Sequence, residues 1–530
     1  MSEKVAATVG EGEASLELAR QAVDGAHERV GVARRDFMKL FGFGGAALLA
    51  GRAGASDRDR GGGGEGGPYA SAWDFAPGLL YMNIGTTGAS PEGIVRDFGA
   101  DYRDMARDPV GYFFGQQAWR NAIAPGFGCD PYELVMSFNT TDGLFRIMLG
   151  LEWKAGDEII TTNMEESAGI SVLAVLADRY GVVVKPVAIP TNDAFSDEEL
   201  FRRFEAQLTS RTKAILFSSP IYLTGTRLQE SDLCLWAASK GILSIVDGAH
   251  LPGMIALDLH AMGCDFLSGA GHKWQCGPGQ TGFMYIRNGT APSPYVRKAP
   301  TSDIAFLVPG GPTVDVPVPG YANTTPLPTY FPTNTLLYGA EQGVQVLLKG
   351  QRNPDHNVAA QLQLVGNGSR PSQQALFQCC QLWDRWGRKD IEDYVVSLAQ
   401  YLRARLVAIW GPRSLSFPSS PHGHVSRIGL TSFNPFSPGF DYNADLTPAQ
   451  AQAQATTAAA ALADLRSGFA IVLRTTTVPH SLRSDPARSA VAGGPGKTAS
   501  TPLRISTHLF HSRRDVDRAV DALLSVVPRP

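Results

Sequence analysis

The chain has 530 residues, of which 44% are apolar and 18% charged, proportions typical of a soluble globular protein with room for more than one domain. Its 47 basic and 50 acidic side chains leave a net charge of −3, so we expect neither nucleic acid nor an anionic membrane as a partner. Six cysteines, none in a CxxC pair, are too few for a disulfide scaffold and give no reason to expect a metal site.

Residues 1–67 have the composition of an export signal and a linker. Arg34 and Arg35 precede a Phe and a short apolar stretch, and residues 53–55 have the A-x-A form of a cleavage site. The apolar stretch is too short to span a bilayer, and the glycine-rich residues 61–67 are a flexible linker by composition. This pattern resembles a bacterial twin-arginine signal, which predicts a periplasmic or secreted protein carried by that export machinery, without stable membrane insertion. A basic amphipathic helix of the folded domain is the alternative.

Residues 135–151, VMSFNTTDGLFRIMLGL, predict a buried strand, a turn of capping residues and an apolar helix. Free N–H groups at the start of such a helix can bind a phosphate, and the hydroxyls of Thr140 and Thr141 would add donors. A capped helix without a ligand explains these residues equally well. A strand and the loop after it are predicted at 158–168, and further strands at 182–189 and 213–218. This order of strands and helices indicates a doubly wound α/β fold.

Residues 241–287 carry the clearest chemistry. One apolar run ends on Asp247, and a second leads through glycines to His272 and Lys273; both fit strands buried on two faces, whose carboxyl ends are where such sheets bind ligands. An acid and an amine placed there suit pyridoxal phosphate: the lysine holds the aldehyde as a Schiff base and the carboxylate keeps the ring nitrogen protonated. His250 could bind the phenolic oxygen. Singly, a helix cap, a surface lysine and a turn histidine explain these residues as well; their combination favours the cofactor.

The strings DGAH, GHKW and GPGQTG in this stretch resemble the class V aminotransferase family of fold-type I pyridoxal phosphate enzymes, and HKW is typical of its isopenicillin N epimerase-like branch. The resemblance covers about residues 81 to 524. It implies a homodimer with pyridoxal 5'-phosphate, a large doubly wound domain with a mainly parallel sheet, and a smaller C-terminal α+β subdomain. The expected boundaries are a signal and linker at 1–67, an N-terminal segment at 68–95, the large domain at 96–348 and the small subdomain at 349–530.

The resemblance also assigns further residues. Glu166 stands where relatives stack a histidine or an aromatic ring on the pyridine, and Thr333 where they reach the partner subunit's phosphate. Arg504 matches the arginine that grips the substrate carboxylate, and Arg474 is a second candidate for an acidic substrate group. The expected cofactor contacts are Thr140, Thr141, Glu166, Thr224, Asp247, His250, His272, Lys273 and Thr333, with Asn83, Arg474 and Arg504 for the substrate.

The remaining segments predict structure more than chemistry. A helix is expected up to about residue 124, and the proline-rich stretch from 288 to 332 excludes regular helix and central strand, so we expect a loop that covers the pocket. Residues 361–375, with little periodicity, are expected to be an insertion. Helices are expected at 335–348, 391–410 and 446–465, with a closing strand and helix at 503–524.

The function predicted is an exported enzyme acting at the α-carbon of an amino-acid or peptide-like amine, with Lys273 as catalytic base. Epimerisation, transamination and elimination all remain open. Desulfurases of the family carry a nucleophilic cysteine in the loop that is here residues 475–480, and because this loop has none, persulfide chemistry is not expected. A catalytically inactive protein with the same fold, serving as a binding or maturation partner, is the alternative.

Overall fold

The computed structural model describes residues 67–109, 116–131, 133–189, 196–287, 296–300, 313–317, 362–363, 368–416, 427–444, 446–478 and 499–529. The chain divides into two units, 1–64 and 65–530, and all described residues belong to the second. The predicted export signal, Thr333 and the helix expected at 335–348 lie outside the described residues.

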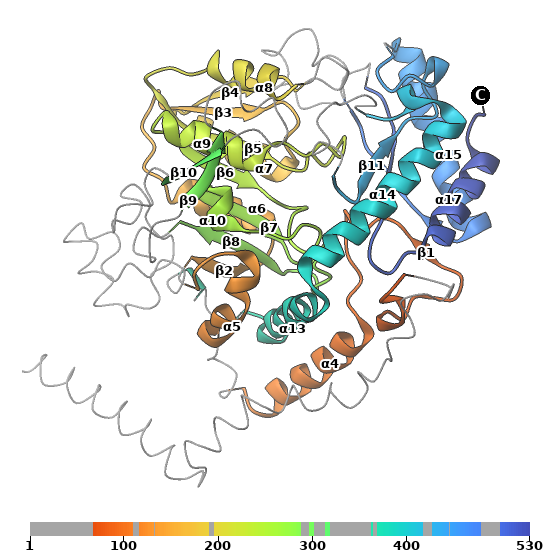
Figure 1. Ribbon diagram of the computed structural model, residues 1–530, viewed down its shortest axis with the longest axis horizontal. Helices are drawn as coiled ribbons and strands as arrows, with labels where there is room; N and C mark the ends of the chain where they lie inside the picture. Colours follow the sequence, from red (N-terminus) through yellow and green to blue (C-terminus); the bar gives the residue numbers. More distant parts are fainter. Residues whose placement is uncertain are drawn as a thin grey trace, which may run out of the picture. The chain divides into compact units, whose positions relative to one another are not determined.

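The main sheet is built from β2 (Leu134–Ser137), β3 (Glu158–Thr162), β4 (Val183–Val187), β5 (Thr212–Ser218), β6 (Leu243–Asp247), β7 (Phe266–Ala270) and β8 (Gly282–Ile286). Within the described residues these form one seven-stranded sheet in the order β2-β8-β7-β6-β5-β3-β4 (Figure 1). Neighbours from β4 to β7 are parallel, whereas β8 runs opposite to both β7 and β2. The carboxyl ends of β2, β3, β5, β6 and β7 therefore all lie along one edge.

The strands are buried on both faces, as their continuous apolar runs predict. Ile159, Ile245 and Phe266 pack on one face with apolar residues of α6 (Thr140–Leu149) and α7 (Ser167–Tyr180). The next residue along each strand belongs to a second core, on the other face, shared with α8 (Asp197–Glu205), α9 (Glu230–Ser239) and α10 (Leu259–Met262). Helices on both faces of a mainly parallel sheet confirm the predicted doubly wound α/β fold.

A second region is formed mostly by the end of the chain. The strands β11 (Leu430–Phe433), β14 (Leu503–Ser506) and β13 (Arg474–Thr475) make an antiparallel sheet with β14 in the middle, and β1 (Leu80–Tyr81) pairs in parallel with β12 (Ile471–Val472). The helices α14 (Arg388–Trp410), α15 (Pro448–Phe469) and α17 (Arg513–Val526) lie beside these strands (Figure 1). Helices and strands share a separate apolar core. The helices expected at 391–410 and 446–465 and the closing strand and helix are thus confirmed.

Two expectations were wrong. Residues 370–375 are not part of an irregular insertion but the first turns of α13 (Arg370–Trp386), where Ala375 and Leu376 are fully buried and the helix packs against α4 (Glu92–Arg107). The helix expected to run to about residue 124 is also not continuous, because α4 ends at Arg107 and α5 (Gln116–Ile123) follows separately.

Short elements complete the described structure. In the proline-rich stretch, β9 (Val296–Pro300) and β10 (Thr313–Pro317) pair only with each other, so the predicted absence of a central strand holds for the part that is described. No helix in the described ranges is long and apolar enough to cross a membrane. Single turns of 3-10 helix lie at η2 (Ala70–Ala72), η3 (Ala124–Phe127), η6 (Pro412–Ser414) and η7 (Pro438–Phe440).

Candidate active site

The predicted acid and amine follow two adjacent strands at the same edge of the sheet. Asp247 is the last residue of β6, and β7 ends three residues before Lys273. The loop that carries the lysine is held through its backbone: Gly88 N–H donates to His272 O at 2.7 Å, and a Cβ at position 88 would lie 2.0 Å from Lys273 O. Only glycine permits this close backbone contact. The strand order therefore brings the two predicted groups together.

Asp247 and Lys273 are both mostly buried, and each alters the charge state of the other. Burial raises the pKa of Asp247 to about 6, although the Ala249 N–H and Lys273 oppose that rise. Burial also lowers the pKa of Lys273 to about 8, against the attraction of Asp247. Asp247 Oδ1 accepts from Ala249 N–H at 3.1 Å, and within the described ranges its other oxygen has no donor. That oxygen is available to a ligand.

His250, one turn past Asp247, is 2% exposed. Its Nδ1 accepts a hydrogen bond from Trp274 Nε1 at 3.0 Å. Burial lowers the pKa of His250 well below its ordinary value, and the positive charges of Lys273, Arg504 and Arg474 lower it further. The imidazole is therefore neutral at physiological pH.

The phosphate site predicted at the start of α6 has a suitable geometry. Asn139 is the N-cap residue, and its side chain accepts from Asp142 N–H at 2.8 Å, which leaves the first N–H groups of the helix available. Thr140 is buried, and its Oγ1 has no hydrogen-bond partner among the residues that the structure describes. Thr141 is exposed. Helix N–H groups beside an unpartnered hydroxyl form a site for an anion such as phosphate.

Two arginines lie opposite one another on neighbouring strands of the smaller sheet. Arg504 of β14 lies opposite Arg474 of β13, and both donate to Thr86 Oγ1, at 2.8 Å and 3.0 Å. Arg504 is 1% exposed, and its Nη2 is also 3.5 Å from Asn83 Oδ1. Burial and the neighbouring Arg474 lower the pKa of Arg504 to about 9. Across the described ranges neither arginine pairs with a carboxylate, so the pair is suited to an external anion.

Two consecutive acids follow β3. Glu166 caps α7, with its carboxylate accepting from Ser167 Oγ at 2.6 Å and Ala168 N–H at 2.7 Å. Although burial opposes it, these bonds and the charge of Lys273 lower the pKa of Glu166. Glu166 is therefore an anion close enough to interact electrostatically with Lys273. Sequence reasoning did not identify Glu165, the next residue back, which is 4% exposed and interacts with the charge of Asp247.

Sequence reasoning also missed Tyr222. Burial raises the pKa of its phenol, and the charges of Glu166, Arg474 and Arg504 act on the same group, which places it among the site residues. Thr224, in the same loop, is the residue predicted from the sequence to contact the cofactor. Its hydroxyl lies 2.7 Å from that of Thr226 and has no described contact with Lys273 or Asp247. Because the chain turns at Gly225, the sequence pattern does not show whether Tyr222 or Thr224 faces the site.

The remaining predicted residue is His272, whose Nδ1 lies 3.2 Å from Thr281 O. A carbonyl only accepts, so Nδ1 carries a proton and Nε2 is left for a ligand. Burial lowers the pKa of His272.

Comparison with known proteins agrees with this geometry. Residues 115–298 match the family described as Aminotransferase class-V. This part of the chain is similar to class V aminotransferase domains. The isopenicillin N epimerase of Streptomyces clavuligerus is 28% identical over 218 residues, which is 40% of this chain and 54% of that protein. The isopenicillin N epimerase of Amycolatopsis lactamdurans is 29% identical over 231 residues, 41% of this chain and 58% of that protein. The chain thus spans about half the length of the curated relatives it matches.

Solved structures resemble the fold over most of the chain. The apo cysteine desulfurase from Thermococcus onnurineus NA1 has a TM-score of 0.55 and 18% identity, covering 85% of this chain and 94% of that one. The cystine C-S lyase C-DES, solved with cysteine persulfide, has a TM-score of 0.54 and 19% identity, covering 84% and 98%. The chain therefore has the fold of fold-type I pyridoxal phosphate enzymes.

The family match indicates pyridoxal phosphate as the cofactor, and the residues present fit it. In the part of the chain that the structure describes, Thr140 Oγ1 is buried without a partner beside free helix N–H groups, as a phosphate requires. Asp247 has one carboxylate oxygen open for the ring nitrogen, and the Lys273 amine has no hydrogen-bond partner in the described ranges. When bound, the cofactor supplies an electron sink for charge that develops at the carbon bearing the substrate amine.

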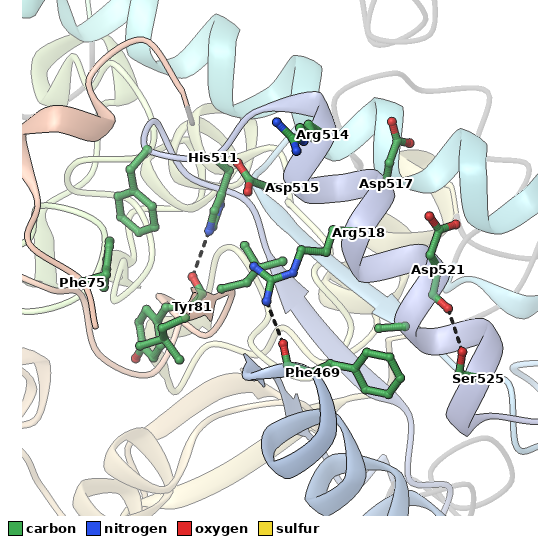
Figure 2. Close-up of a pocket in the computed structure, with 14 residues that line it drawn as sticks. Phe75, Tyr81, Phe469, His511, Arg514, Asp515, Asp517, Arg518, Asp521 and Ser525 are labelled. Atoms are coloured by element: carbon green, nitrogen blue, oxygen red, sulfur yellow. Dashed lines mark hydrogen bonds between the residues drawn. The ribbon is translucent and has the colours of Figure 1, made fainter. Parts of the chain in front are cut away.

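A separate hollow of about 760 Å³ lies between α17 and residues 75–81 (Figure 2). Its polar groups bind one another: His511 Nε2 donates to Tyr81 O at 2.9 Å, and Arg518 Nη2 donates to Phe469 O at 2.7 Å. Asp517, on the same helix, pairs with Arg405. This arrangement joins the N-terminal segment to α17, so we place the chemistry at Lys273 and not in this hollow.

Proposed function

We propose that the protein is a pyridoxal phosphate-dependent enzyme that acts at the amine-bearing carbon of an anionic amino-acid or peptide-like substrate. The observation that carries this proposal is that Lys273 and Asp247 lie near a pair of arginines, Arg474 and Arg504, that no described carboxylate neutralises. An inactive protein would gain nothing from burying the Arg504 guanidinium without a described carboxylate partner, because an unpaired charge is costly to bury.

The side chains divide the work. Arg504 and Arg474 would bind the anionic group of the substrate and so fix which bond faces the lysine. Because burial lowers the pKa of Lys273 to about 8, its Nζ can take up and return a proton near neutral pH. Asp247, at the end of β6, would hold the ring nitrogen protonated. The neutral phenol of Tyr222 lies among Glu166 and both arginines, where it can donate to the substrate.

Among possible outcomes, we propose epimerisation or transamination first. The similarity to proteins named isopenicillin N epimerase supports it. Sulfur transfer through a persulfide on a cysteine of the protein is disfavoured, because all six cysteines are buried and burial raises the pKa of Cys380, for example, to about 12. Elimination remains the second candidate within the same site, since the chain also resembles a hercynylcysteine sulfoxide lyase of Schizosaccharomyces pombe, 28% identical over 176 residues.

Exchange of the α-proton with deuterium oxide tests the proposal without knowledge of the product. The loaded protein should exchange the α-proton of glutamate, which carries a second acid, faster than that of alanine, and should leave a simple primary amine unchanged. Arg504→Lys should raise KM strongly because a bidentate contact is lost, whereas Arg403→Lys, outside the site, should not. Absence of exchange for every amino acid and acidic dipeptide tried would contradict the proposal.

We also propose that the protein is exported by the twin-arginine route. The paired Arg34 and Arg35 ahead of an apolar stretch support this. Changing both to Lys should keep the protein in the cytoplasm, while the same change at Arg58 and Arg60 should not. Recovery of the Arg34→Lys, Arg35→Lys protein from the periplasm would show that the signal has been misinterpreted.

A homodimer is the proposed assembly, with Thr333 reaching the partner's phosphate. The family resemblance supports it. Light scattering should give twice the 56.7 kDa of one chain, and Thr333→Val should weaken cofactor binding without dissociating the dimer. A monomeric mass in a protein that still binds cofactor would contradict this.

A further inference from the structure

The residue after the proposed cofactor lysine makes a contact that fixes the state of a neighbouring histidine. Trp274 is fully buried, and its Nε1–H donates to His250 Nδ1 at 3.0 Å. An indole nitrogen can only donate, so His250 Nδ1 must present its lone pair. The single proton of the neutral imidazole is thereby confined to Nε2.

The free edge of His250 faces the site. A Cβ placed on Gly85 would lie 3.4 Å from His250 Cε1, 3.3 Å from Arg504 Nη2 and 3.3 Å from Ser506 Oγ, so these three groups border one space. No described residue accepts from His250 Nε2. The charged and titratable groups facing the ring are Lys273, Arg504, Arg474 and His272, all of which oppose a second proton on it.

Trp274 is itself held in place from several sides. His508 Nε2 donates to Trp274 O at 3.0 Å, and the two rings lie 5.9 Å apart at 32°. On another side, a Cβ at Gly429 would come within 2.8 Å of the indole Cζ3, which shows how closely the backbone covers the ring. The indole therefore cannot turn away and release His250 without displacing its surroundings.

We infer that Trp274 is a positioning residue that keeps His250 in its Nε2–H form, so that this histidine can only donate a hydrogen bond to the phenolic oxygen of the bound cofactor. The inference rests on the proposed function for the identity of the acceptor. The tautomer itself is a property of the protein alone. Without the indole, His250 could place its proton on either nitrogen or become charged, and its bond to that oxygen would no longer be fixed.

The test begins with protein free of cofactor and labelled with ¹⁵N-histidine. In the wild type, the His250 signals, assigned by their loss in His250→Gln, should report the Nε2–H form alone at pH 7. In Trp274→Phe they should report a mixture of tautomers or a titration near the ordinary histidine pKa of about 6.5. Trp383→Phe is the matched control, because Trp383 is equally buried and donates to Gly253 O at 2.8 Å.

The loaded protein gives the second readout. Trp274→Phe should shift the pH midpoint of the visible absorbance by about 1 to 2 units, the equivalent of one buried hydrogen bond, and Trp383→Phe should not. In a His250→Gln background, Trp274→Phe should no longer shift the pH midpoint of the visible absorbance, because Trp274 is expected to act only through His250.

The outcomes separate the two proposals. Nδ1–H or charged His250 in the wild type, or an unchanged His250 in Trp274→Phe, would overturn the inference even if the protein turns yellow with cofactor. A protein that stays colourless while its His250 is in the Nε2–H form would refute the proposed function and leave Trp274's effect on His250 standing. If Trp274→Phe fails to fold, the tautomer of His250 measured in the wild-type protein decides whether the inference stands.

Discussion

Two buried glutamates at opposite ends of β3 have pKa values shifted in opposite directions. Glu158 begins the strand and accepts from Thr209 Oγ1 at 2.6 Å, Lys185 Nζ at 2.9 Å and Arg211 Nη2 at 3.1 Å. Burial alone would raise its pKa, but these bonds together lower the pKa of Glu158 to about 2. The charge at this end of the strand is paired.

Glu165 follows the other end of β3, and its donors among the described residues are all neutral. Ser218 Oγ–H reaches it at 2.5 Å and Ser218 N–H at 3.2 Å, with Thr162 Oγ–H as a third donor. Burial, with the nearby Asp247, raises the pKa of Glu165 to about 7. At the carboxyl edge of the sheet, acidic and basic groups thus lack a directly bonded partner of opposite charge among the described residues. This is destabilising and is typical of sites that move protons.

The largest effect expected from this comparison is on turnover. Asp247→Asn removes the unmatched acid proposed for the ring nitrogen, so α-proton exchange should fall at least about 10²-fold. Glu158→Gln alters only the paired end and should leave exchange by the folded protein unchanged. If both variants lose exchange activity equally, the proposal that only the carboxyl edge of the sheet takes part in the reaction is contradicted.

Cofactor affinity should show the next largest effect. Thr140→Val removes the unpartnered buried hydroxyl at the α6 start, and loss of one bond to a charged group should weaken cofactor binding by about 10- to 100-fold. Thr161→Val is the matched control, because Thr161 Oγ1 is also buried, has no partner among the described residues, and lies within β3. Equilibrium titration with cofactor measures both variants, and equal affinities would remove Thr140 from the phosphate site.

The smallest effect is on stability, and its sign differs between the two glutamates. Because the folded-state pKa of Glu165 is raised from 4.5 to about 7, stability should fall as pH rises through that window. Glu165→Gln should remove this loss and stabilise the cofactor-free protein at pH 8 by about 1–3 kcal/mol. Denaturant unfolding at several pH values measures it.

For Glu158 the pKa is lowered from 4.5 to about 2, so its contribution is present above pH 4.5 and is lost as pH falls toward 2. Glu158→Gln should therefore destabilise the protein at neutral pH. If both variants change stability in the same direction at pH 8, the contrast between the paired and unmatched ends fails.

Sequence pattern predicted much of this arrangement because its main features are local. Short apolar runs that stop on Asp247 or lead to Lys273 define buried strands, and parallel strands end at one edge. The start of α13 was missed because SRPSQQ is polar, yet Pro371, Ser372 and Gln373 are buried by packing that no periodicity shows. Contacts between distant segments were invisible for the same reason.

The arginine pair illustrates that limit. Arg474 and Arg504 were each identified from the sequence, but only the register of β13 against β14 shows that they are neighbours sharing Thr86. The bond from Trp274 to His250 likewise joins residues 24 positions apart. Glu165 was overlooked because two adjacent acids give no signal of which one the sheet buries.

The most direct test of the account is chemical reduction of the loaded protein with borohydride, followed by peptide mass spectrometry. The account predicts that the cofactor becomes fixed to one peptide, at Lys273, and that Lys273→Ala loses both this label and the visible absorbance, while the matched variant Lys240→Ala, at a surface lysine paired with Glu205, keeps them. A label on another lysine, or a Lys273→Ala protein that still retains reducible cofactor, would contradict it.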